Sequence, residues 1–384
     1  MLKSCQRCWG DKVRGFGVKK KIMKIAIILP NLCGGGAERL HINLAIYWSK
    51  QGHIVEFFLM KNQGELLTLV AKEVKILSPN VERIRSFILP IKRYLKNTKP
   101  DIVLSAMWPL TSATTLAWFL SSKQGKLFLS EHVILTTSVI NELFLPSWLV
   151  GLSLKITYPF ATGIIAVSHR VKNDLCTLGK FSCNHIKVIY NPVATGTFKN
   201  KEFDSIKAEN WGIGYNYHIL AVGTLKPEKN YKSLIQAFSY IAEENNAKLV
   251  ILGDGDLRTD LEALIIKLKL EDRVSLFGFV IDPYPWYKSA DLFVSSSLWE
   301  GFGNVIVEAL ECGVPVVSTD SGGPSEILKD GVYGKLVPVD DCNTLAVAMN
   351  ESLQESHNSN FLMDRARDFS ISKISKKYLN YFSC

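Results

Sequence analysis

Short apolar runs alternate with longer segments of helical periodicity along nearly the whole sequence. This alternation is typical of βαβ units, which build parallel sheets with helices on both faces. The first series of runs predicts strands at 25–29, 55–59, 102–105, 127–130 and 164–167. A second series predicts strands at 219–222, 249–252, 274–277, 292–295 and 314–317. The sequence therefore predicts an α/β protein with two doubly wound, Rossmann-like parallel-sheet domains.

A polar stretch of weak periodicity separates the two series and divides the chain, whose 384 residues suit two domains. We predict a basic, disordered arm or misassigned start at 1–22, a first domain at 23–195, a linker at 196–216, a second domain at 217–370 and a C-terminal helix at 371–384 that returns to the first domain. Open α/β sheets bind ligands outside the carboxyl ends of their strands, so we expect the ligand in a cleft between the domains.

Charge is unevenly divided between the halves of the chain. Residues 1–200 contain 27 Lys and Arg against 10 Asp and Glu, whereas residues 201–384 contain 18 against 26. The basic half predicts an anionic partner, with nucleic acid and an acidic membrane surface as the candidates. The segment 143–167 is long enough to cross a bilayer, but Pro146, Lys155 and Pro159 interrupt it. We therefore predict a surface-seeking helix there, followed by a buried strand.

The eight cysteines are scattered, and Cys5 and Cys8 form the single CxxC pair. A zinc quartet would need a second pair. Scattered thiols fit a reducing cytosol, where they act as small buried hydrophobic side chains. We predict that role for them here.

Two glycine-containing loops carry the candidate chemistry. The loop 32–39 follows the first predicted strand, and its glycines allow either an anion at a helix N-terminus or simply a tight turn. The run 300–308 follows the strand at 292–295 and places Glu300 and Glu308 on either side of a strand-to-helix turn. If the helix begins near Gly303, Glu308 lies about 7.5 Å along it. Loop amides could then hold a phosphate while the carboxylates accept hydrogen bonds from sugar hydroxyls.

This run, together with the downstream segment 322–326, resembles the signature of glycosyltransferase family 4, the retaining enzymes of GT-B fold. The resemblance extends from Met23 over nearly the whole chain and includes five further segments. These are the glycine loop 34–39, Ser130-Glu131-His132, the segment 188–193, the loop 222–230 and the segment 252–255. The resemblance implies a GT-B fold with an N-terminal acceptor domain and a C-terminal nucleotide-sugar domain.

The resemblance also implies roles for individual residues. Glu300 would contact hydroxyls of the donor sugar, Glu308 would bind the ribose, and Lys229 would neutralise the diphosphate. His132, at the end of a first-domain strand, would lie near the transferred sugar. Catalysis would thus use His132, Glu300 and Lys229. Donor and nucleotide binding would further involve Gly35, Gly36, Thr224, Gly253, Asp254, Gly301, Phe302, Gly303 and Asn304.

Thr224 and Glu326 each allow two interpretations. The family commonly has an arginine where this chain has Thr224, so either Lys226 supplies the missing charge or the diphosphate is held less tightly. Glu326 follows a glycine pair at a predicted helix start, where its carboxylate could cap free amides or reach the ligand; capping is the preferred interpretation.

The implied reaction is a retaining, front-side transfer in which the leaving diphosphate takes the proton of the acceptor. Lys229 and helix amides would stabilise the leaving group, and the sequence carries no Asp-x-Asp pair in the expected place, so we predict no cofactor and no metal ion. The donor would be a nucleotide-diphosphate sugar, which we predict to be a UDP-sugar carrying a hexose or N-acetylhexosamine. The acceptor would be a polysaccharide or a glycan linked to polyprenyl diphosphate, in bacterial surface glycan synthesis.

The basic segment 83–96 and an apolar patch of Phe144, Leu145, Trp148 and Leu149 predict peripheral binding to an anionic membrane from the cytoplasm. Buried core helices would explain the apolar residues equally well. Nucleic-acid binding would explain the basic half but not the paired carboxylates, so no nucleic-acid partner is predicted. The alternatives are a transfer-inactive nucleotide-sugar-binding protein and a nicotinamide-dependent oxidoreductase, for which the G-x-G-x-x-G fingerprint is missing.

Overall fold

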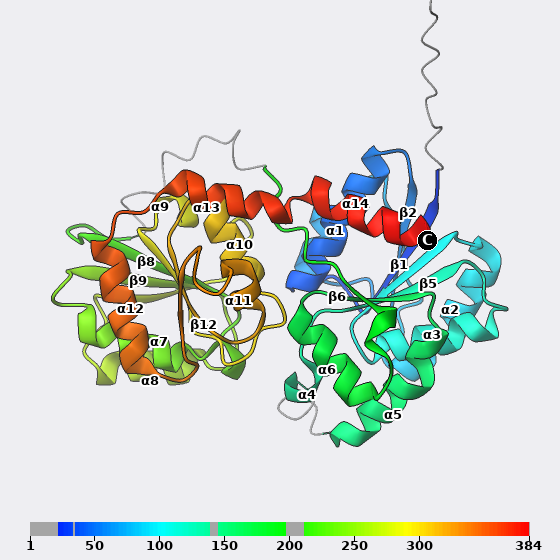
Figure 1. Cartoon of the computed structure of the whole chain (residues 1–384), viewed down its shortest axis with the longest axis horizontal. Helices are drawn as coiled ribbons and strands as arrows, with labels where there is room; N and C mark the ends of the chain where they lie inside the picture. Colours follow the sequence, from blue (N-terminus) through cyan, green and yellow to red (C-terminus); the bar gives the residue numbers. More distant parts are fainter. Residues whose placement is uncertain (1–21, 34, 139–144, 197–210, 384) are drawn as a thin grey trace, which may run out of the picture.

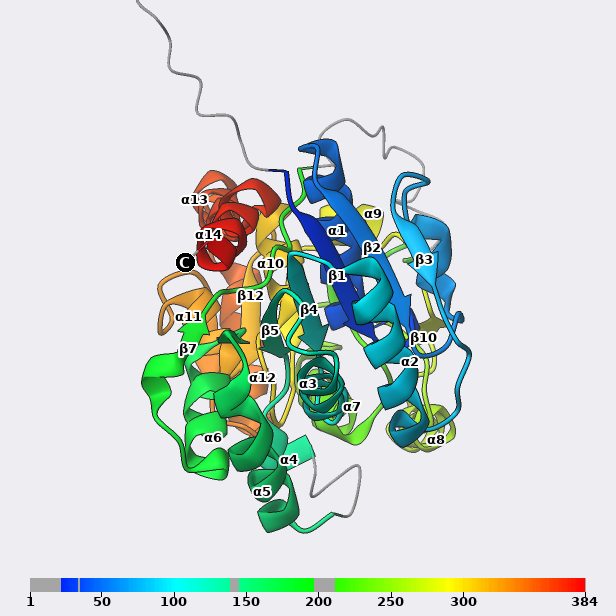
Figure 2. The same ribbon diagram turned by 90° about the vertical axis from the view of Figure 1, so that its right-hand side faces the viewer.

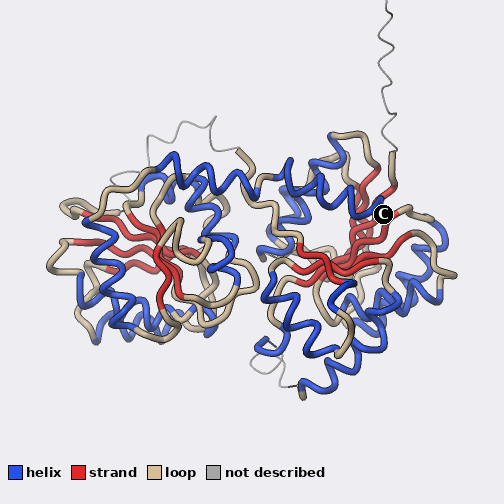
Figure 3. The backbone as a smooth tube through the Cα atoms, viewed as in Figure 1, coloured by secondary structure: helices blue, strands red, loops and turns tan. Residues whose placement is uncertain are grey.

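A computed structural model describes residues 22–33, 35–138, 145–196 and 211–383. The chain folds into two α/β domains side by side, each built on a parallel sheet with helices on both faces (Figures 1 and 3). The predicted fold class is therefore confirmed. Residues 1–21 of the predicted arm at 1–22, most of the linker at 196–216, and Phe144 lie outside the described residues, as do Cys5 and Cys8.

The N-terminal domain has a seven-stranded sheet of order β3-β2-β1-β4-β5-β6-β7. In chain order its strands are β1 Lys24–Leu29, β2 Ile54–Leu59, β3 Lys75–Leu77, β4 Ile102–Ala106, β5 Lys126–Glu131, β6 Gly163–Ala166 and β7 Ile186–Val188. Its helices are α1 Gly36–Lys50, α2 Ile84–Thr98, α3 Leu110–Leu120, α4 Leu135–Ser138, α5 Ser147–Thr157 and α6 His169–Gly179. The central strands are continuous apolar runs because helices cover both faces of the sheet.

The C-terminal domain has a six-stranded sheet of order β10-β9-β8-β11-β12-β13. Its strands are β8 Tyr217–Val222, β9 Ala247–Leu252, β10 Val274–Gly278, β11 Leu292–Ser295, β12 Val316–Thr319 and β13 Lys335–Val337. The helices that follow are α7 Tyr231–Ile241, α8 Arg258–Lys267, α9 Tyr284–Ser289, α10 Asn304–Glu311, α11 Gly323–Leu328, α12 Cys342–Gln354, α13 Ser359–Ala366 and α14 Ile371–Ser383.

The strand order reverses at β1 and β4 in the first sheet and at β8 and β11 in the second. Crevices form at such switch points, outside the carboxyl ends of the strands. The loops that follow these four strands therefore define where a ligand can bind. They include the glycine loop after β1, the loop of Lys229 after β8 and the turn of Glu300 after β11.

The chain passes between the domains twice, and the two passages are hydrogen-bonded to each other. Ala194 pairs with Ser370 in a parallel bridge, and the amides of Val193 and Ala194 both donate to the carbonyl of Phe369. Helix α14 then lies against α1 of the N-terminal domain (Figure 1), where the Trp48 indole donates to the hydroxyl of Ser375 at 2.8 Å. The last helix thus packs on the first domain.

Three details differ from the sequence-based expectation. The sheets also contain β3, β7 and β13, each of only three residues, and β12 begins at Val316 rather than at Val314. Cys176 and Cys183 form a disulfide, and Cys33 is exposed, so the prediction that the cysteines are all buried hydrophobic filler was wrong. The segment 143–167, by contrast, contains helix α5 followed by the buried strand β6, as the sequence predicted, and none of the described helices is long and apolar enough to span a membrane.

Candidate functional site

Lys229 and Glu300 form an ion pair at the carboxyl ends of β8 and β11. The Lys229 ammonium donates to Glu300 Oε2 at 2.6 Å, and about a fifth of each side chain is exposed. Ser297 Oγ donates to the same carboxylate oxygen at 3.3 Å. The backbone of Lys229 is held in place, because its carbonyl accepts a hydrogen bond from Ser296 Oγ at 2.7 Å. The sequence predicted both residues in the site, and the structure joins them directly.

The turn that carries Glu300 is held by the loop after β12. The Glu300 amide donates to the carbonyl of Ser321 at 2.9 Å, and its own carbonyl accepts from the amide of Gly323 at 3.0 Å. Phe302 is 2% exposed and stacks on Tyr190, with ring centroids 5.6 Å apart. Its side chain therefore belongs to the core, so its contribution to a ligand can come from its backbone.

Gly301 touches the N-terminal domain. A Cβ added at Gly301 would lie 2.1 Å from the carbonyl oxygen of His132, a distance that excludes any side chain. The carbonyl of Gly301 accepts a hydrogen bond from Ser168 Oγ at 2.6 Å. The predicted donor loop and the predicted first-domain histidine are thus in direct contact across the domain boundary.

Gly303 and Asn304 begin α10. Gly303 has a φ of +103°, a conformation that favours glycine, and it precedes the first helical residue. Asn304 Oδ1 accepts from the side-chain amide of Asn191 at 2.8 Å, and its Nδ2 donates to the carbonyl of Gly36 at 3.3 Å. The first turn of a helix has amides without intrahelical acceptors, so this turn lies beside the glycine loop with anion-binding capacity.

Glu308 lies in the second turn of α10 and is 8% exposed. Its Oε2 accepts a hydrogen bond from the hydroxyl of Tyr287 at 3.0 Å. Burial raises the pKa of Glu308 to about 7, against the opposing effect of the nearby Arg39 guanidinium. Arg39 comes from α1 and donates to the carbonyl of Ile281 at 2.6 Å, so it bridges the two domains. The carboxylate is therefore poised to change its ionisation near neutral pH.

The glycine loop is described from Gly35 onward, since Gly34 lies outside the described residues. Gly35 precedes α1 in extended conformation, and the carbonyl of Gly36 meets Asn304. Burial raises the pKa of Glu38 in the first turn of the same helix. The loop thus contacts the start of α10, which supports the binding interpretation over a turn of purely local importance.

The remaining predicted donor residues lie in the loops after β8 and β9. Thr224 and Lys226 are both exposed, and Gly253 packs so tightly that a Cβ would lie 1.9 Å from the carbonyl of Gly223. Asp254 accepts from Arg258 Nε at 3.0 Å and from the amide of Gly255 at 2.8 Å. Its carboxylate thus bonds within its own loop and helix, whereas the Lys229–Glu300 pair forms the centre of the site.

His132 is 8% exposed, and its Nε2 lies 2.9 Å from Ser130 Oγ. Burial, aided by the neighbouring His41, lowers the pKa of His132 well below its usual range. Glu326 acts as a cap, as preferred from the sequence, but for a helix of the other domain. Its Oε1 accepts from the backbone amide of Arg170 at 3.2 Å, in the first turn of α6.

Sequence reasoning did not identify Tyr287, Ser297, Ser168 or His41 as neighbours of the site. Tyr287 and Glu308 are separated by 21 residues and Ser168 and Gly301 by 133, so no local spacing pattern connects them. Among the described residues, no group of three or more His, Cys, Asp or Glu side chains could hold a metal ion.

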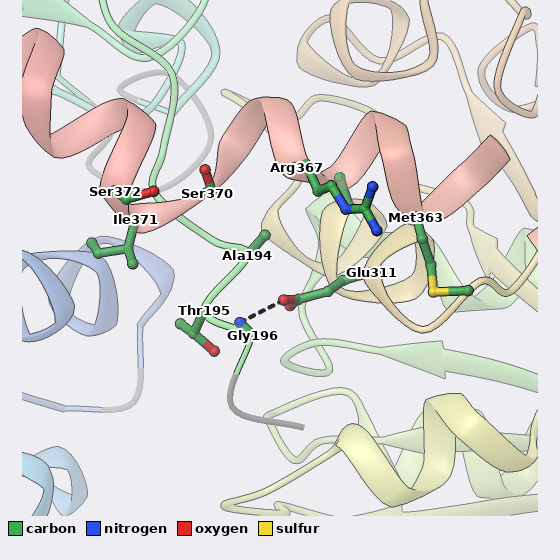
Figure 4. Close-up of a pocket in the computed structure, with 10 residues that line it drawn as sticks. Ala194, Thr195, Gly196, Glu311, Met363, Arg367, Ser370, Ile371 and Ser372 are labelled. Carbon is green, nitrogen blue, oxygen red and sulfur yellow. Dashed lines mark hydrogen bonds between the residues drawn. The ribbon is translucent and has the colours of Figure 1, made fainter. Parts of the chain in front are cut away.

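The cavity at the joint between the domains does not coincide with this chemistry. A cavity of about 280 Å³ lies at the two passages between the domains (Figure 4). It is lined by Ala194, Thr195, Gly196, Glu311, Met363, Ala366, Arg367, Ser370, Ile371 and Ser372. Only about 10 Å³ is open beside Lys229. We locate the site by the charged groups at the strand ends, where Lys229 and Glu300 meet.

Comparison with known proteins identifies the family of the chain. The family model described as "Glycosyl transferases group 1" matches residues 206–369, and the model described as "Glycosyltransferase Family 4" matches residues 34–196. The fold resembles the crystal structure of Anabaena Alr3699/HepE in complex with UDP and glucose, with a TM-score of 0.78 and 22% identity over 94% of this chain and 99% of that one. The two facing domains define a GT-B fold. The chain belongs to glycosyltransferase family 4, and not to the nicotinamide-dependent oxidoreductases.

Two relatives from Campylobacter jejuni have curated names. The first, N-acetylgalactosamine-N,N'-diacetylbacillosaminyl-diphospho-undecaprenol 4-alpha-N-acetylgalactosaminyltransferase, is 32% identical over 59% of this chain. That match spans 62% of the length of the relative, which is less than two thirds. The second, GalNAc-alpha-(1->4)-GalNAc-alpha-(1->3)-diNAcBac-PP-undecaprenol alpha-1,4-N-acetyl-D-galactosaminyltransferase, is 27% identical over 93% of this chain and 98% of the relative.

Proposed function

We propose that the protein is a retaining glycosyltransferase that moves a hexose or N-acetylhexosamine from a UDP-sugar to a polysaccharide or polyprenyl-diphosphate-linked acceptor of a bacterial surface glycan. The observation that carries this proposal is the Lys229–Glu300 pair at the β8–β11 switch point, beside the contact between Gly301 and His132. The names of the Campylobacter relatives support the acceptor class, and the UDP complexes among the structural neighbours support the nucleotide.

In this proposal Lys229 stabilises the departing diphosphate. An incoming diphosphate competes with Glu300 for the ammonium group, which leaves the carboxylate to accept hydrogen bonds from sugar hydroxyls. Negative charge grows on the leaving oxygen as the anomeric bond breaks, so a fixed cation binds the transition state more tightly than the ground state. The acceptor oxygen attacks the anomeric carbon on the same face, and the leaving diphosphate takes its proton. Lys229 and the first turn of α10 supply the positive potential, and we propose that no metal ion is required.

The N-terminal domain is proposed to bind the acceptor at an anionic membrane. The bulky residues Phe87, Ile91, Tyr94 and Leu95 of α2 are buried, as a core helix requires, while its basic residues Arg83, Arg85, Arg93 and Lys96 are exposed. Helices α2, α3 and α5 pack side by side (Figure 2). Large apolar side chains are exposed on α3 and α5 and just after α5. These are Leu116, Phe119, Leu120, Trp148, Leu149, Leu152, Ile156 and Phe160. Charge from α2 and apolar area from α3 and α5 together suit the surface of a bilayer.

Thermal unfolding with UDP, GDP, ADP and NAD, in the wild type and in Glu308→Ala, tests nucleotide binding. A ligand at about 100 times its Kd adds roughly 2.7 kcal/mol of stability, which raises the unfolding midpoint measurably. We expect a shift with UDP that the substitution abolishes. A shift with NAD alone, or with none of the four, would contradict the proposal.

Transfer itself is tested with a panel of UDP-hexoses and UDP-N-acetylhexosamines and an undecaprenyl-diphosphate-linked glycan. The anomeric proton of the product, observed by NMR, distinguishes retention from inversion. Addition of a chelator should leave the rate unchanged. UDP binding without turnover on any donor and acceptor pair would favour the alternative of a transfer-inactive binding protein, which the exposed Thr224 leaves open.

A further inference from the structure

A buried polar cluster lies behind His132 and connects three elements of the N-terminal half of the site. It consists of Ser130 and His132 at the end of β5, His41 on α1 and Tyr378 on α14. The rings of His41 and His132 meet edge-on, with centroids 5.2 Å apart and planes at 69°. His41, Ser130 and Tyr378 are fully buried. Bulk water therefore does not reach their polar atoms, and protein neighbours are their available hydrogen-bond partners in the described residues.

Some buried polar side-chain atoms of the described residues lack a hydrogen-bond partner, and three of these atoms fall in this one cluster. They are His41 Nε2, His132 Nδ1 and the hydroxyl oxygen of Tyr378. The Tyr378 hydroxyl lies beside Ser130 but does not form a full hydrogen bond with it. Burial raises the pKa of Tyr378, and the neighbouring Ser130 opposes this increase. Orphaned polar groups are rare in protein interiors, so three at one place require a common explanation.

The position of the proton on His41 can be assigned. His41 Nδ1 lies 2.7 Å from the carbonyl oxygen of Ala37, which can only accept, so Nδ1 carries the proton. Burial lowers the pKa of His41 to about 4, and the ring is therefore neutral at neutral pH. It follows that His41 Nε2 presents a lone pair to the buried cluster.

His132 then has two possible tautomers. A proton on Nε2 would be donated to Ser130 Oγ at 2.9 Å and would leave two rings in edge contact, His132 and His41, each with an unpartnered lone pair. A proton on Nδ1 instead gives the two rings one free N–H and one free lone pair, and Ser130 donates to Nε2. The Ser130 oxygen is then free to accept from Tyr378. Only the second order supplies the two touching rings with both a donor and an acceptor.

We propose that His41 is a positioning residue for His132, which it holds as the neutral tautomer with its proton on Nδ1. In this arrangement Tyr378 donates to Ser130, Ser130 donates to Nε2 of His132, and His132 directs its Nδ1 proton toward His41. The tautomer of His132 does not depend on the proposed function, but its consequence for the reaction rests on that function. A neutral His132 places no positive charge against the oxocarbenium-like sugar, whereas an imidazolium there would oppose the charge that develops.

Long-range ¹H–¹⁵N correlation spectra of the full chain with ¹⁵N-labelled histidine test the proposal, and His132→Asn assigns the His132 signals. We expect wild-type His132 to show a protonated Nδ1 and an unprotonated Nε2. In His41→Phe the lone pair is lost, so His132 should shift to a mixture of tautomers or to the Nε2-protonated form. His41→Gln, which returns a carbonyl acceptor, should restore the wild-type pattern at least in part.

His53→Phe is the matched control, because His53 is buried in the same domain but lies before the amino end of β2, whereas His132 follows the carboxyl end of β5. It should leave the His132 signals unchanged. A protonated Nε2 in the wild type would overturn the proposal even if His41→Phe failed to fold. An unchanged tautomer in folded His41→Phe would overturn it as well. UDP binding measured on the same samples tests the proposed function separately, since its loss would leave the tautomer result standing.

Discussion

Lys229 donates a hydrogen bond of 2.6 Å to Glu300 across 71 residues of sequence, and each side chain remains about one-fifth exposed. The two groups are thus neutralised by each other while still reachable from outside. A substrate that brings both a diphosphate and sugar hydroxyls offers a new partner to each of them at once. The pair therefore prepares the site for this combination of groups without burying an uncompensated charge.

Replacing Lys229 by alanine should lower kcat by roughly 10² to 10³, the usual effect of removing one donor to a developing anion. Initial rates of UDP release measure this effect. Lys232→Ala removes an exposed lysine three residues further along and should stay close to the wild-type rate. Equal losses in the two variants would mean that net charge, and not the position of Lys229, is responsible.

The stability of the protein should depend on pH through Glu308. Its folded-state pKa of about 7 lies above the usual 4.5, so the stability it contributes is complete below pH 4.5 and is lost as the pH rises through 7. Glu308→Gln cannot ionise and should exceed the wild type at pH 8.5 by up to about 3 kcal/mol. Guanidinium unfolding at pH 5, 7 and 8.5 measures the difference, which should fade at the acidic end. A constant difference over this range would show that the carboxyl group does not titrate there.

UDP affinity should increase as Glu308 ionises, because a carboxylate accepts hydrogen bonds from ribose hydroxyls more strongly than the neutral acid does. Arg39 is the cation that favours the ionised form, so Arg39→Leu should move the midpoint of this increase to higher pH. Calorimetric titration with UDP between pH 6 and 8.5 tests the shift. Glu308→Gln supplies the reference, since it retains only the titration of the nucleotide phosphate.

Gly301→Ala should keep the fold of each domain but force Gly301 and His132 apart, since a Cβ would lie 2.1 Å from the His132 carbonyl oxygen. A displacement of this size at a reacting centre costs about 100-fold in turnover. Gly52→Ala is the comparison, because that glycine has a φ of +89° and open space around it, far from the strand ends that carry the site. It should lower stability without lowering turnover. Wild-type turnover in Gly301→Ala would remove this contact from the proposed mechanism.

Vesicles containing anionic lipid should bind the protein at low salt, and neutral vesicles should bind it less. Trp148→Glu combined with Leu152→Glu places charge on side chains that are 66% and 47% exposed and should abolish sedimentation with the vesicles. Ile266→Glu, at a residue on α8 that is 61% exposed, is the matched control and should bind like the wild type. A wild-type protein that stays in the supernatant at low salt would refute membrane docking.

Much of the fold could be predicted from the sequence, because strands buried on both faces are apolar runs that stand out against helical segments. β3, β7 and β13 were missed since each has three residues, too few for a recognisable run. β12 was placed two residues early because Val314 and Pro315 continue its apolar pattern. Proline has no amide hydrogen for the ladder, and the structure begins the strand after it.

Site residues that lie close together in the sequence could be predicted, whereas contacts between residues far apart in the sequence could not. Glu300 and Glu308 lie in one run of nine residues, so the sequence identified both. The contact of Arg39 with Ile281 spans 242 residues, and the meeting of His41 with His132 spans the first sheet. Such contacts depend on how helices pack on sheets and how the domains face each other, which no spacing encodes. The cysteine bridge was missed for a related reason, because only the path of the chain after α6 brings Cys183 back to Cys176.

The two passages between the domains, bonded through Val193, Ala194, Phe369 and Ser370, have a mechanical consequence. A single extended strand can bend and twist in any direction, whereas two parallel strands tied by hydrogen bonds resist twisting about their common axis. A twist of one domain against the other would therefore have to break these hydrogen bonds, whereas bending would not. The double joint thus favours the relative orientation in which Gly301 lies against His132.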